Sequence, residues 1–180
     1  KIDISKFFYE INRDVLFVKI EKIIKCKKSL DVIYRFVYDN EDLKGIPIGN
    51  LTSQLFANLM LNDLDHFIKR TLKCKYYLRY MDDMIILDSN KDKLNYIFSE
   101  IKKILDYEKL RLNPKSGIFD LKQGVDFVGY RTWKNKRLIR KQSLFRIRKS
   151  LKKGFNQNRV HSFLSHAKDN GLGQKYLIQH

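Results

Sequence analysis

The pattern of apolar and polar positions in the first part of the chain predicts a short strand followed by helices. Residues 1–5, KIDIS, alternate weakly between polar and apolar and predict a strand. Apolar residues then recur at helical spacing over 7–26 and again over 51–72. Between these two helices, residues 44–50 (KGIPIGN) contain two glycines and a proline and therefore predict a loop.

The middle of the chain predicts a hairpin and then a long helix. Residues 76–88 have the pattern of two short strands joined by a tight turn at 81–83. The clearest helix follows over 89–107, where Ser89 and Asp92 resemble a capping box and the apolar residues form one stripe.

Shorter elements are predicted beyond this helix. A loop around 113–115 leads to a short strand near 117–120 and to a hairpin over 125–133. Two basic helical stretches follow near 142–153 and 157–169. Because strands and helices are mixed and the strand pairs are separated, the pattern predicts an α+β fold rather than an alternating parallel sheet.

The charge of the chain is strongly basic and unevenly distributed. The 180 residues carry a formal net charge of +17, and residues 134–180 contribute +12 of it, with 13 Lys and Arg against 1 acid. This excess favours a polyanionic partner, above all nucleic acid, and a solvated basic tail is the alternative. Apolar residues make up 43% of the chain, which is enough to form a real core.

Several classes of protein are disfavoured. Cys26 and Cys74 lie far apart and without metal-ligand spacing, which argues against a disulfide framework or a zinc site. No apolar run approaches the roughly 20 residues that span a bilayer, and no signal peptide is evident, so we expect a cytoplasmic protein without a membrane partner. Lys- and Asn-rich usage favours a bacterial or phage origin. The chain opens with Lys1 in the middle of a pattern, so we expect it to be a piece of a longer protein.

The stretch YLRYMDDMIILD (77–88) places two adjacent carboxylates among apolar residues. Burying an unpaired carboxylate is unfavourable, and Asp82 and Asp83 repel each other. A divalent cation would make the arrangement favourable, and Mg²⁺ typically takes one or two carboxylates together with substrate phosphates. Asp3, at the end of the first predicted strand, is the best candidate for a further carboxylate. The alternative is that Asp82–Asp83 is an ordinary turn and Asp3 a surface acid.

Five stretches carry a resemblance to a known family. KIDISKFF, GIPIGNLTSQ, YLRYMDD, LRLNPKSG and FVGYRTW follow one another in the order of the palm motifs of reverse transcriptases. The resemblance covers residues 1–133 and implies a polymerase palm, an antiparallel sheet packed on helices. Residues 134–180 would begin a basic helical thumb, and the family's fingers, which precede these motifs, are absent. GIPIGNLTSQLFAN is most similar to the reverse transcriptases of diversity-generating retroelements, because Ile48 and Gln54 replace the usual Gln and Pro.

The resemblance implies a two-metal active site. Asp3 and Asp82 match the metal ligands, Asp83 is the second acid of the turn, and Ile4 completes the metal-binding positions. Two Mg²⁺ ions are implied, with Mn²⁺ able to substitute. Lys115 matches a lysine that approaches the pyrophosphate leaving group as a general acid, and a solvated lysine is an equal alternative.

Four positions are implied to bind the incoming nucleotide. Phe8 matches the aromatic steric gate that excludes a 2′-hydroxyl, with an ordinary core phenylalanine as the alternative. Gly49 and Gln54 match the segment under the nascent base pair. Ile48 replaces a polar Gln there, and we hypothesise that the loss of its hydrogen bonds lowers fidelity.

Template and primer contacts are implied at the 125–133 hairpin and in the basic segment. The residues assigned to nucleic-acid binding there are Phe127, Gly129, Tyr130, Arg137, Arg140, Lys141, Arg148, Lys149 and Lys152. Arg79, next to the Asp82–Asp83 turn, is a further candidate for phosphate contact, and an ordinary exposed strand arginine is an equal alternative. Such contacts go mainly to phosphates, so binding is expected to fall steeply with added salt.

The implied activity is that of an RNA-directed DNA polymerase. Its partners would be template RNA, a primer, dNTPs and a small basic helical accessory protein, and its copying would be error-prone. Retron, group II intron and phage-defence reverse transcriptases are alternatives within this class. A non-catalytic nucleic-acid-binding remnant without fingers is the alternative from another class. A coding sequence for fingers upstream of Lys1 would support the enzyme, and an immediate upstream stop codon would support the remnant.

Overall fold

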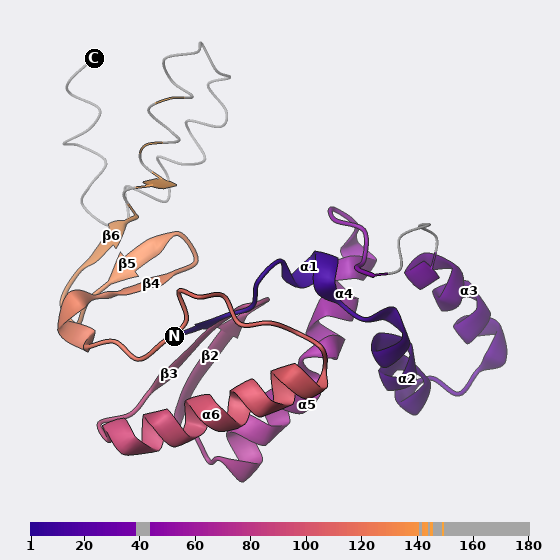
Figure 1. Cartoon of the computed structure of the whole chain (residues 1–180). Coiled ribbons are helices and arrows are strands. Elements are labelled where there is room, and N and C mark those ends of the chain that lie inside the picture. Colours follow the sequence, from indigo (N-terminus) through magenta and orange to yellow (C-terminus); the bar gives the residue numbers. More distant parts are fainter. Residues whose placement is uncertain (39–43, 141, 144, 146–148, 150–180) are drawn as a thin grey trace. The chain divides into compact units, whose positions relative to one another are not determined.

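The computed structural model is shown in Figure 1. It describes residues 1–38, 44–140, 142–143, 145 and 149. The chain divides into two compact units, residues 1–118 and 119–180, which are described separately below. The predicted palm and thumb segments, 1–133 and 134–180, rest on motifs, and that functional division stays a prediction.

The first unit contains one small antiparallel sheet and a set of helices. Its elements are β1 (Ile2–Asp3), α1 (Phe7–Glu10), α2 (Arg13–Ile23), α3 (Lys27–Tyr38), α4 (Leu51–Met60), α5 (Asn62–His66), the π-helical turn η1 (Phe67–Thr71), β2 (Tyr76–Tyr80), β3 (Asp83–Leu87) and α6 (Lys91–Tyr107). The strand order is β1-β3-β2, with both pairings antiparallel. The predicted mixture of helices with an antiparallel sheet is confirmed.

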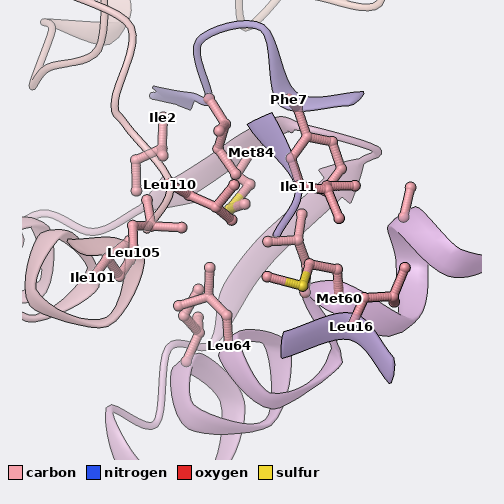
Figure 2. Close-up of a cluster of buried hydrophobic side chains, with 14 of the residues drawn as sticks. Ile2, Phe7, Ile11, Leu16, Met60, Leu64, Met84, Ile101, Leu105 and Leu110 are labelled. Atoms are coloured by element: carbon pink, nitrogen blue, oxygen red, sulfur yellow. The ribbon is translucent and has the colours of Figure 1, made fainter. Parts of the chain in front are cut away.

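The sheet of the first unit is buried on one face. Ile2 and Met84 pair across β1 and β3, and both side chains enter the core with Ile101 of α6 and Leu64 of α5 (Figure 2). On the other face, Tyr76, Leu78 and Tyr80 are each more than half exposed, Leu78 at 56%. This alternation is typical of an antiparallel sheet that packs on helices with one face and meets solvent with the other.

The predicted helix over 7–26 is wrong as a single element. Ile11 is extended and buried, and the chain starts a new helix at Arg13. The side chain of Asn12 accepts hydrogen bonds from the backbone N–H groups of Asp14 and Val15, which is the N-cap of α2. Helix α3 is an addition to the predicted elements.

Two further boundaries differ from the pattern-based predictions. The 51–72 helix is interrupted at Leu61, where α4 ends and α5 begins. The 89–107 helix starts at Lys91 with Asn90 as its N-cap, because the Asn90 side chain accepts the N–H of Lys93. The predicted capping box at Ser89 is therefore wrong, and the cap lies one residue later.

The strand predicted near 117–120 is not formed. Instead, residues 111–117 run beside β1 without regular strand geometry, apart from one bridge between Ile4 and Leu112. The two segments are joined by backbone bonds from Ser5 to Arg111 and, in both directions, between residues 1 and 117. This irregular edge, and not a strand, places residues 113–116 beside Asp3.

The second unit contains a three-stranded antiparallel sheet. Its elements are the 3₁₀ turn η2 (Leu121–Gln123), β4 (Val125–Phe127), β5 (Tyr130–Thr132) and β6 (Arg137–Ile139). The predicted hairpin is confirmed, and β6 extends it. Val128 and Gly129 both have positive φ, at 45° and 82°, as a two-residue hairpin turn of the primed type requires.

The helices predicted near 142–153 and 157–169 fall mostly outside the described residues. Of the first stretch, residues 142, 143, 145 and 149 are described, and all four are helical. Within the part of the chain that the structure covers, no helix is long and apolar enough to span a membrane.

Gly124 offers a test of the packing in the second unit. Its φ is +76°, and a Cβ there would lie 2.6 Å from Cε2 of Trp133. Gly124→Ala is therefore expected to destabilise this unit by about 2–4 kcal/mol, through backbone strain and overpacking. Trp133 is the chain's single tryptophan, so its fluorescence during urea unfolding measures the effect locally. Gly129→Ala is the matched control, because its φ is +82° but the nearest atom is 4.0 Å away. Equal losses in the two variants would contradict a packing role for Gly124.

Candidate active site

Three aspartates meet at one end of the β1-β3-β2 sheet. Asp3 lies directly opposite Asp83 in the antiparallel register of β1 and β3, and Asp82 occupies the turn before β3. The backbone N–H and C=O of Asp3 bond Ser116 and Asn113 on the other side of β1. The Asp3–Asp83 pair is therefore of the non-hydrogen-bonded type, in which side chains on the same face lie closest.

The turn that carries Asp82 is a two-residue hairpin loop. Tyr80 and Asp83 are the last pair of the β2–β3 ladder, so Met81 and Asp82 alone connect the strands. Met81 adopts a left-handed conformation, with φ of +52°. The predicted hairpin is confirmed, but its turn is one residue shorter than predicted, because Asp83 already belongs to β3; the turn holds Asp82 at the tip, next to the end of β1.

The electrostatics of the turn oppose ionisation of Asp82. Burial raises the pKa of its carboxyl above the ordinary value, and the charges of Asp3 and Asp83 raise it further. Asp83 forms an ion pair with Lys1, whose Nζ lies 3.2 Å from Oδ1, yet that oxygen is buried and accepts no hydrogen bond. The site therefore concentrates negative charge that the protein itself neutralises incompletely.

The donor set fits a small, hard cation held by few protein ligands. Among the described residues, no group of three or more His, Cys, Asp or Glu side chains is arranged to hold a metal ion. One or two carboxylates are, however, the usual protein contribution to Mg²⁺ when substrate phosphates and water supply the remaining ligands. Asp3 and Asp82 are those candidates. The backbone carbonyl of Ile4 is a further candidate ligand. The backbone groups that bond residues 111–117 belong to Asp3 and Ser5, so the N–H and C=O of Ile4, which lies between them, point to the opposite side, towards β3.

Two side chains that were not among the predicted site residues hold Asp3 in place. Asn113 donates its side-chain amide to Oδ2 of Asp3 at 3.0 Å. The Ser116 hydroxyl accepts the Asp3 N–H and donates to its C=O, both at 3.0 Å. Both residues lie in the LRLNPKSG motif, which was the available signal. Lys115 lies between them with an exposed side chain, while its N–H donates to the Asn113 side chain.

The loop at 44–50, which carries two of the four predicted nucleotide-binding positions, is anchored to α1, which carries a third. The Ile46 N–H donates to the C=O of Phe8, and the Gly45 N–H donates to that of Ile11. Phe8 is half-buried, so it is neither fully core nor free. Ile48 and Gly49 follow this anchor and are exposed, and Gly49 has a φ of +100° with open space at its Cα. The fourth position, Gln54, is exposed on the second turn of α4.

Gly45 is the residue that allows this loop to approach α1. A Cβ there would lie 2.9 Å from the carbonyl oxygens of Phe8 and Tyr9, which cannot rotate away, and its φ is +82°. Gly45→Ala is expected to lower the stability by about 2–4 kcal/mol, because the loop must move off α1. Thermal unfolding measures the effect. Gly49→Ala carries similar strain without a clash, so an equal fall in Tm would contradict the close approach.

The site residues and their order agree with a known family. The sequence profile described as "Reverse transcriptase (RNA-dependent DNA polymerase)" matches residues 1–132. The chain belongs to the reverse transcriptase family. The matched part contains the whole first unit, and therefore all three aspartates and the loop anchored to α1.

A curated relative of this reverse transcriptase chain comes from yeast. The "Putative COX1/OXI3 intron 2 protein" of Saccharomyces cerevisiae is 25% identical over an alignment 199 residues long. The alignment covers 72% of the chain. The aligned part is 23% of that relative, so the chain spans about a quarter of its length.

Arg79 of this reverse transcriptase lies close to the Met81–Asp82 turn, but its side chain faces the helices. Its guanidinium bonds the carboxylate of Asp65 on α5, the side chain of Asn58 on α4 and the C=O of Met81. The predicted contact of Arg79 with nucleic acid stays a prediction, although these bonds already engage its side chain within the protein.

The remaining predicted nucleic-acid contacts belong to the second unit. Phe127 and Tyr130 pair across β4 and β5, and both are partly buried. The Arg137 guanidinium lies 4.7 Å from the centre of the Tyr130 ring. The N–H of Arg140 donates to the C=O of Gly129, which ties the end of β6 to the hairpin turn. Lys149 is exposed, and the predicted contacts at Lys141, Arg148 and Lys152 lie outside the described residues.

Proposed function

We propose that the protein containing this chain is an RNA-directed DNA polymerase that adds deoxynucleotides to a primer 3′-hydroxyl. The observation that carries the proposal is the register of β1 and β3, which sets Asp3 opposite Asp83 and beside Asp82. Two Mg²⁺ ions, when bound, would supply polarisation of the attacking hydroxyl and neutralisation of the leaving pyrophosphate, and Mn²⁺ could replace them. Family membership over residues 1–132 supports the same conclusion.

The chain's own residues have defined parts in this proposal. Asp3, Asp82 and the Ile4 carbonyl hold the cations, and Asp83 adds negative charge beside them. Lys115, exposed on the loop that holds Asp3, protonates the leaving pyrophosphate.

The partners in the proposal are nucleic acids and nucleotides. Phe8 restricts the sugar of the incoming nucleotide to a deoxyribose. The second unit and the basic segment after it contact the phosphates of template and primer. A small basic helical accessory protein belongs to the proposal as a further partner.

Primer extension by the full-length protein tests the proposed activity. Purified protein is incubated with a template RNA, an annealed DNA primer, dNTPs and Mg²⁺, and the products are resolved by length. We expect extension that requires the template and Mg²⁺ and that ceases when rNTPs replace dNTPs. Phe8→Ala should restore rNTP use, which distinguishes the steric gate from an ordinary core residue. Binding of template–primer without any extension under these conditions would favour the non-catalytic alternative.

We place the enzyme among the reverse transcriptases of diversity-generating retroelements, on the evidence of its GIPIGNLTSQLFAN motif. Ile48 is 59% exposed on the loop anchored to Phe8, where it offers no hydrogen bond to a nucleotide. Ile48→Gln is expected to lower misincorporation by roughly 10-fold, about the discrimination that one hydrogen-bonding group of 1–2 kcal/mol supplies. Sequencing of extension products from wild type and variant measures the difference. Unchanged error rates would contradict this role of Ile48.

A group II intron reverse transcriptase is the second candidate, because the yeast relative is named as an intron protein. The two candidates differ in what surrounds the gene. A nearby template repeat that differs from a target gene at adenines would support the retroelement, and flanking intron sequence would support the intron enzyme.

A further inference from the structure

Arg79 connects the helices to the turn that carries Asp82. It lies on β2 with Tyr77 on the partly buried face, one residue away from the exposed Leu78 and Tyr80. Its Nε and Nη2 donate to the two carboxylate oxygens of Asp65, a two-pronged contact that fixes the guanidinium plane. The Tyr77 hydroxyl donates to the same carboxylate at 2.5 Å. The guanidinium is thus held from α5 in one orientation.

The remaining arm of Arg79 reaches the turn itself. Nη1 donates to the C=O of Met81 at 3.1 Å and to the side chain of Asn58 at 2.9 Å. The C=O of Met81 and the N–H of Asp82 belong to one planar peptide group. A bond that fixes this carbonyl therefore fixes the plane from which Asp82 departs.

The turn needs such a restraint for two reasons. Met81 has a φ of +52°, a conformation that is unfavourable for a residue with a side chain by about 1–2 kcal/mol. Asp82 is also next to two other carboxylates, because Asp3 pairs with Asp83 in the β1–β3 register, and repulsion between these like charges favours movement of the turn away from β1. A single guanidinium anchored on a helix opposes both tendencies.

We propose that Asp65 and Arg79 form a positioning clamp that holds Asp82 in register with Asp3. The clamp acts on the site through the Met81 carbonyl, which its guanidinium bonds while Asp65 holds it from α5. The inference rests on the proposed polymerase function; it adds Asp65 to the site and gives Arg79 a positioning role besides its predicted contact with nucleic acid. A merely structural ion pair between β2 and α5 would stabilise the protein without affecting how Asp82 meets the cation.

Arg79→Lys in the full-length protein separates these two readings. Lysine keeps the charge and one contact with Asp65, but it cannot bond that carboxylate twice and also reach Met81. We expect kcat for primer extension to fall about 10- to 100-fold, as for a misplacement of about 1 Å, with little change in the KM for template–primer. The Mg²⁺ concentration for half-maximal rate should rise several-fold. The rise in Tm that Mg²⁺ causes should shrink, a measurement that does not depend on activity.

Tyr77→Phe is the matched control, because it removes a bond to Asp65 and leaves the Arg79–Met81 contact intact. It should lower the Tm with wild-type Mg²⁺ dependence. If Arg79→Lys fails to fold, Asp65→Asn provides the second test, since it keeps the shape and loses the charge that anchors Arg79. Its Mg²⁺ dependence should shift in the same direction, by less. Wild-type kcat and Mg²⁺ dependence in a folded clamp variant would overturn the clamp, whereas a wild-type protein without extension would overturn the proposed function.

Discussion

Asp82→Asn is expected to reduce kcat for primer extension by about 10³-fold or more. The change removes one negative charge from the site but keeps the size and shape of the side chain. A bound metal ion stabilises transition-state charge by several kcal/mol, and losing that stabilisation lowers the rate by three or more factors of ten. Asp82 is one of the two candidate carboxylates for this ion. Single-turnover extension at saturating Mg²⁺ and dNTP measures the loss.

The same substitution should make the metal-free protein more stable at pH 7. The pKa of Asp82 is raised in the folded state by burial and by Asp3 and Asp83, so the folded state holds its proton more tightly than the unfolded state. The stability of the folded state therefore falls as the pH rises from the ordinary aspartate pKa to the raised pKa of Asp82. At higher pH the ionised carboxylate destabilises the folded protein. Asp82→Asn removes this destabilising charge. We expect a higher Tm without Mg²⁺, and a smaller Mg²⁺-induced rise than in wild type.

Acidification gives the corresponding result for the wild-type enzyme. As pH falls, Asp82 takes up a proton at a higher pH than an ordinary aspartate and loses its charge for the cation. Activity in the acidic range should therefore fall earlier than Asp ionisation in a peptide would predict, and added Mg²⁺ should move the midpoint to lower pH.

Asp88→Asn is the control for both measurements. Asp88 follows β3 at its other end and pairs with Lys93 at 2.7 Å, far along the strand from the turn. We expect normal extension and no rise in Tm from this variant. Equal extension by wild type and Asp82→Asn would refute the metal-site assignment.

The sequence was sufficient to predict α6 and the β2–β3 hairpin, where local periodicity is regular and uninterrupted. The stripe along α6 recurs through Ile97, Ile101 and Leu105, all of which are buried. The β2–β3 hairpin has a run of strand-forming residues on each side of its turn, which located the turn to within one residue of the observed Met81–Asp82 connection. Ordered motifs added what periodicity could not, namely that Asp3 belongs with Asp82 although nearly eighty residues separate them.

What the sequence did not reveal depends on contacts between distant residues. Asn113 and Ser116 hold Asp3 across more than 100 positions, and no local pattern marks them as its partners. Asn12 fits the polar face of a helix equally well, and it becomes a cap because Ile11 is bonded to Gly45 and buried. Arg79 illustrates the same limit, because no local pattern shows that Asp65 on α5 bonds its guanidinium.

Lys19→Met is expected to lower the Tm of the protein by roughly 10 °C. Lys19 is 8% exposed, and its ammonium bonds the buried carboxylate of Glu108 and the C=O of Met60, with Asp63 at 3.3 Å. These contacts join α2, the end of α4 and the end of α6. Breaking a buried ion pair from one side typically destabilises by about 3–5 kcal/mol, because the remaining charge is left without a partner, and each kcal/mol shifts the Tm by about 2–4 °C at this size.

The pH dependence of this variant identifies the cause of its instability. Burial raises the pKa of Glu108, and the charge of Lys19 opposes that rise. Without Lys19 the pKa rises further, so the folded state binds a proton that the unfolded state releases near the ordinary glutamate value. Stability of Lys19→Met should therefore recover as pH falls towards that value, whereas a packing defect would persist at every pH. Thermal unfolding across pH 5–8 separates the two causes.

A double substitution and a control at an exposed ion pair test whether the charge of Glu108 causes the loss of stability. Lys19→Met combined with Glu108→Leu removes both charges, so it should regain much of the lost stability, as apolar replacements of buried ion pairs often do. Lys103→Met, which breaks an exposed pair with Glu100 on α6, should cost less than about 1 kcal/mol. A large loss there, or a pH-independent loss in Lys19→Met, would show that the charge of Glu108 is not what destabilises the variant. With the expected results, the buried pair is identified as the ionic contact that ties α2 to the C-terminal end of α6.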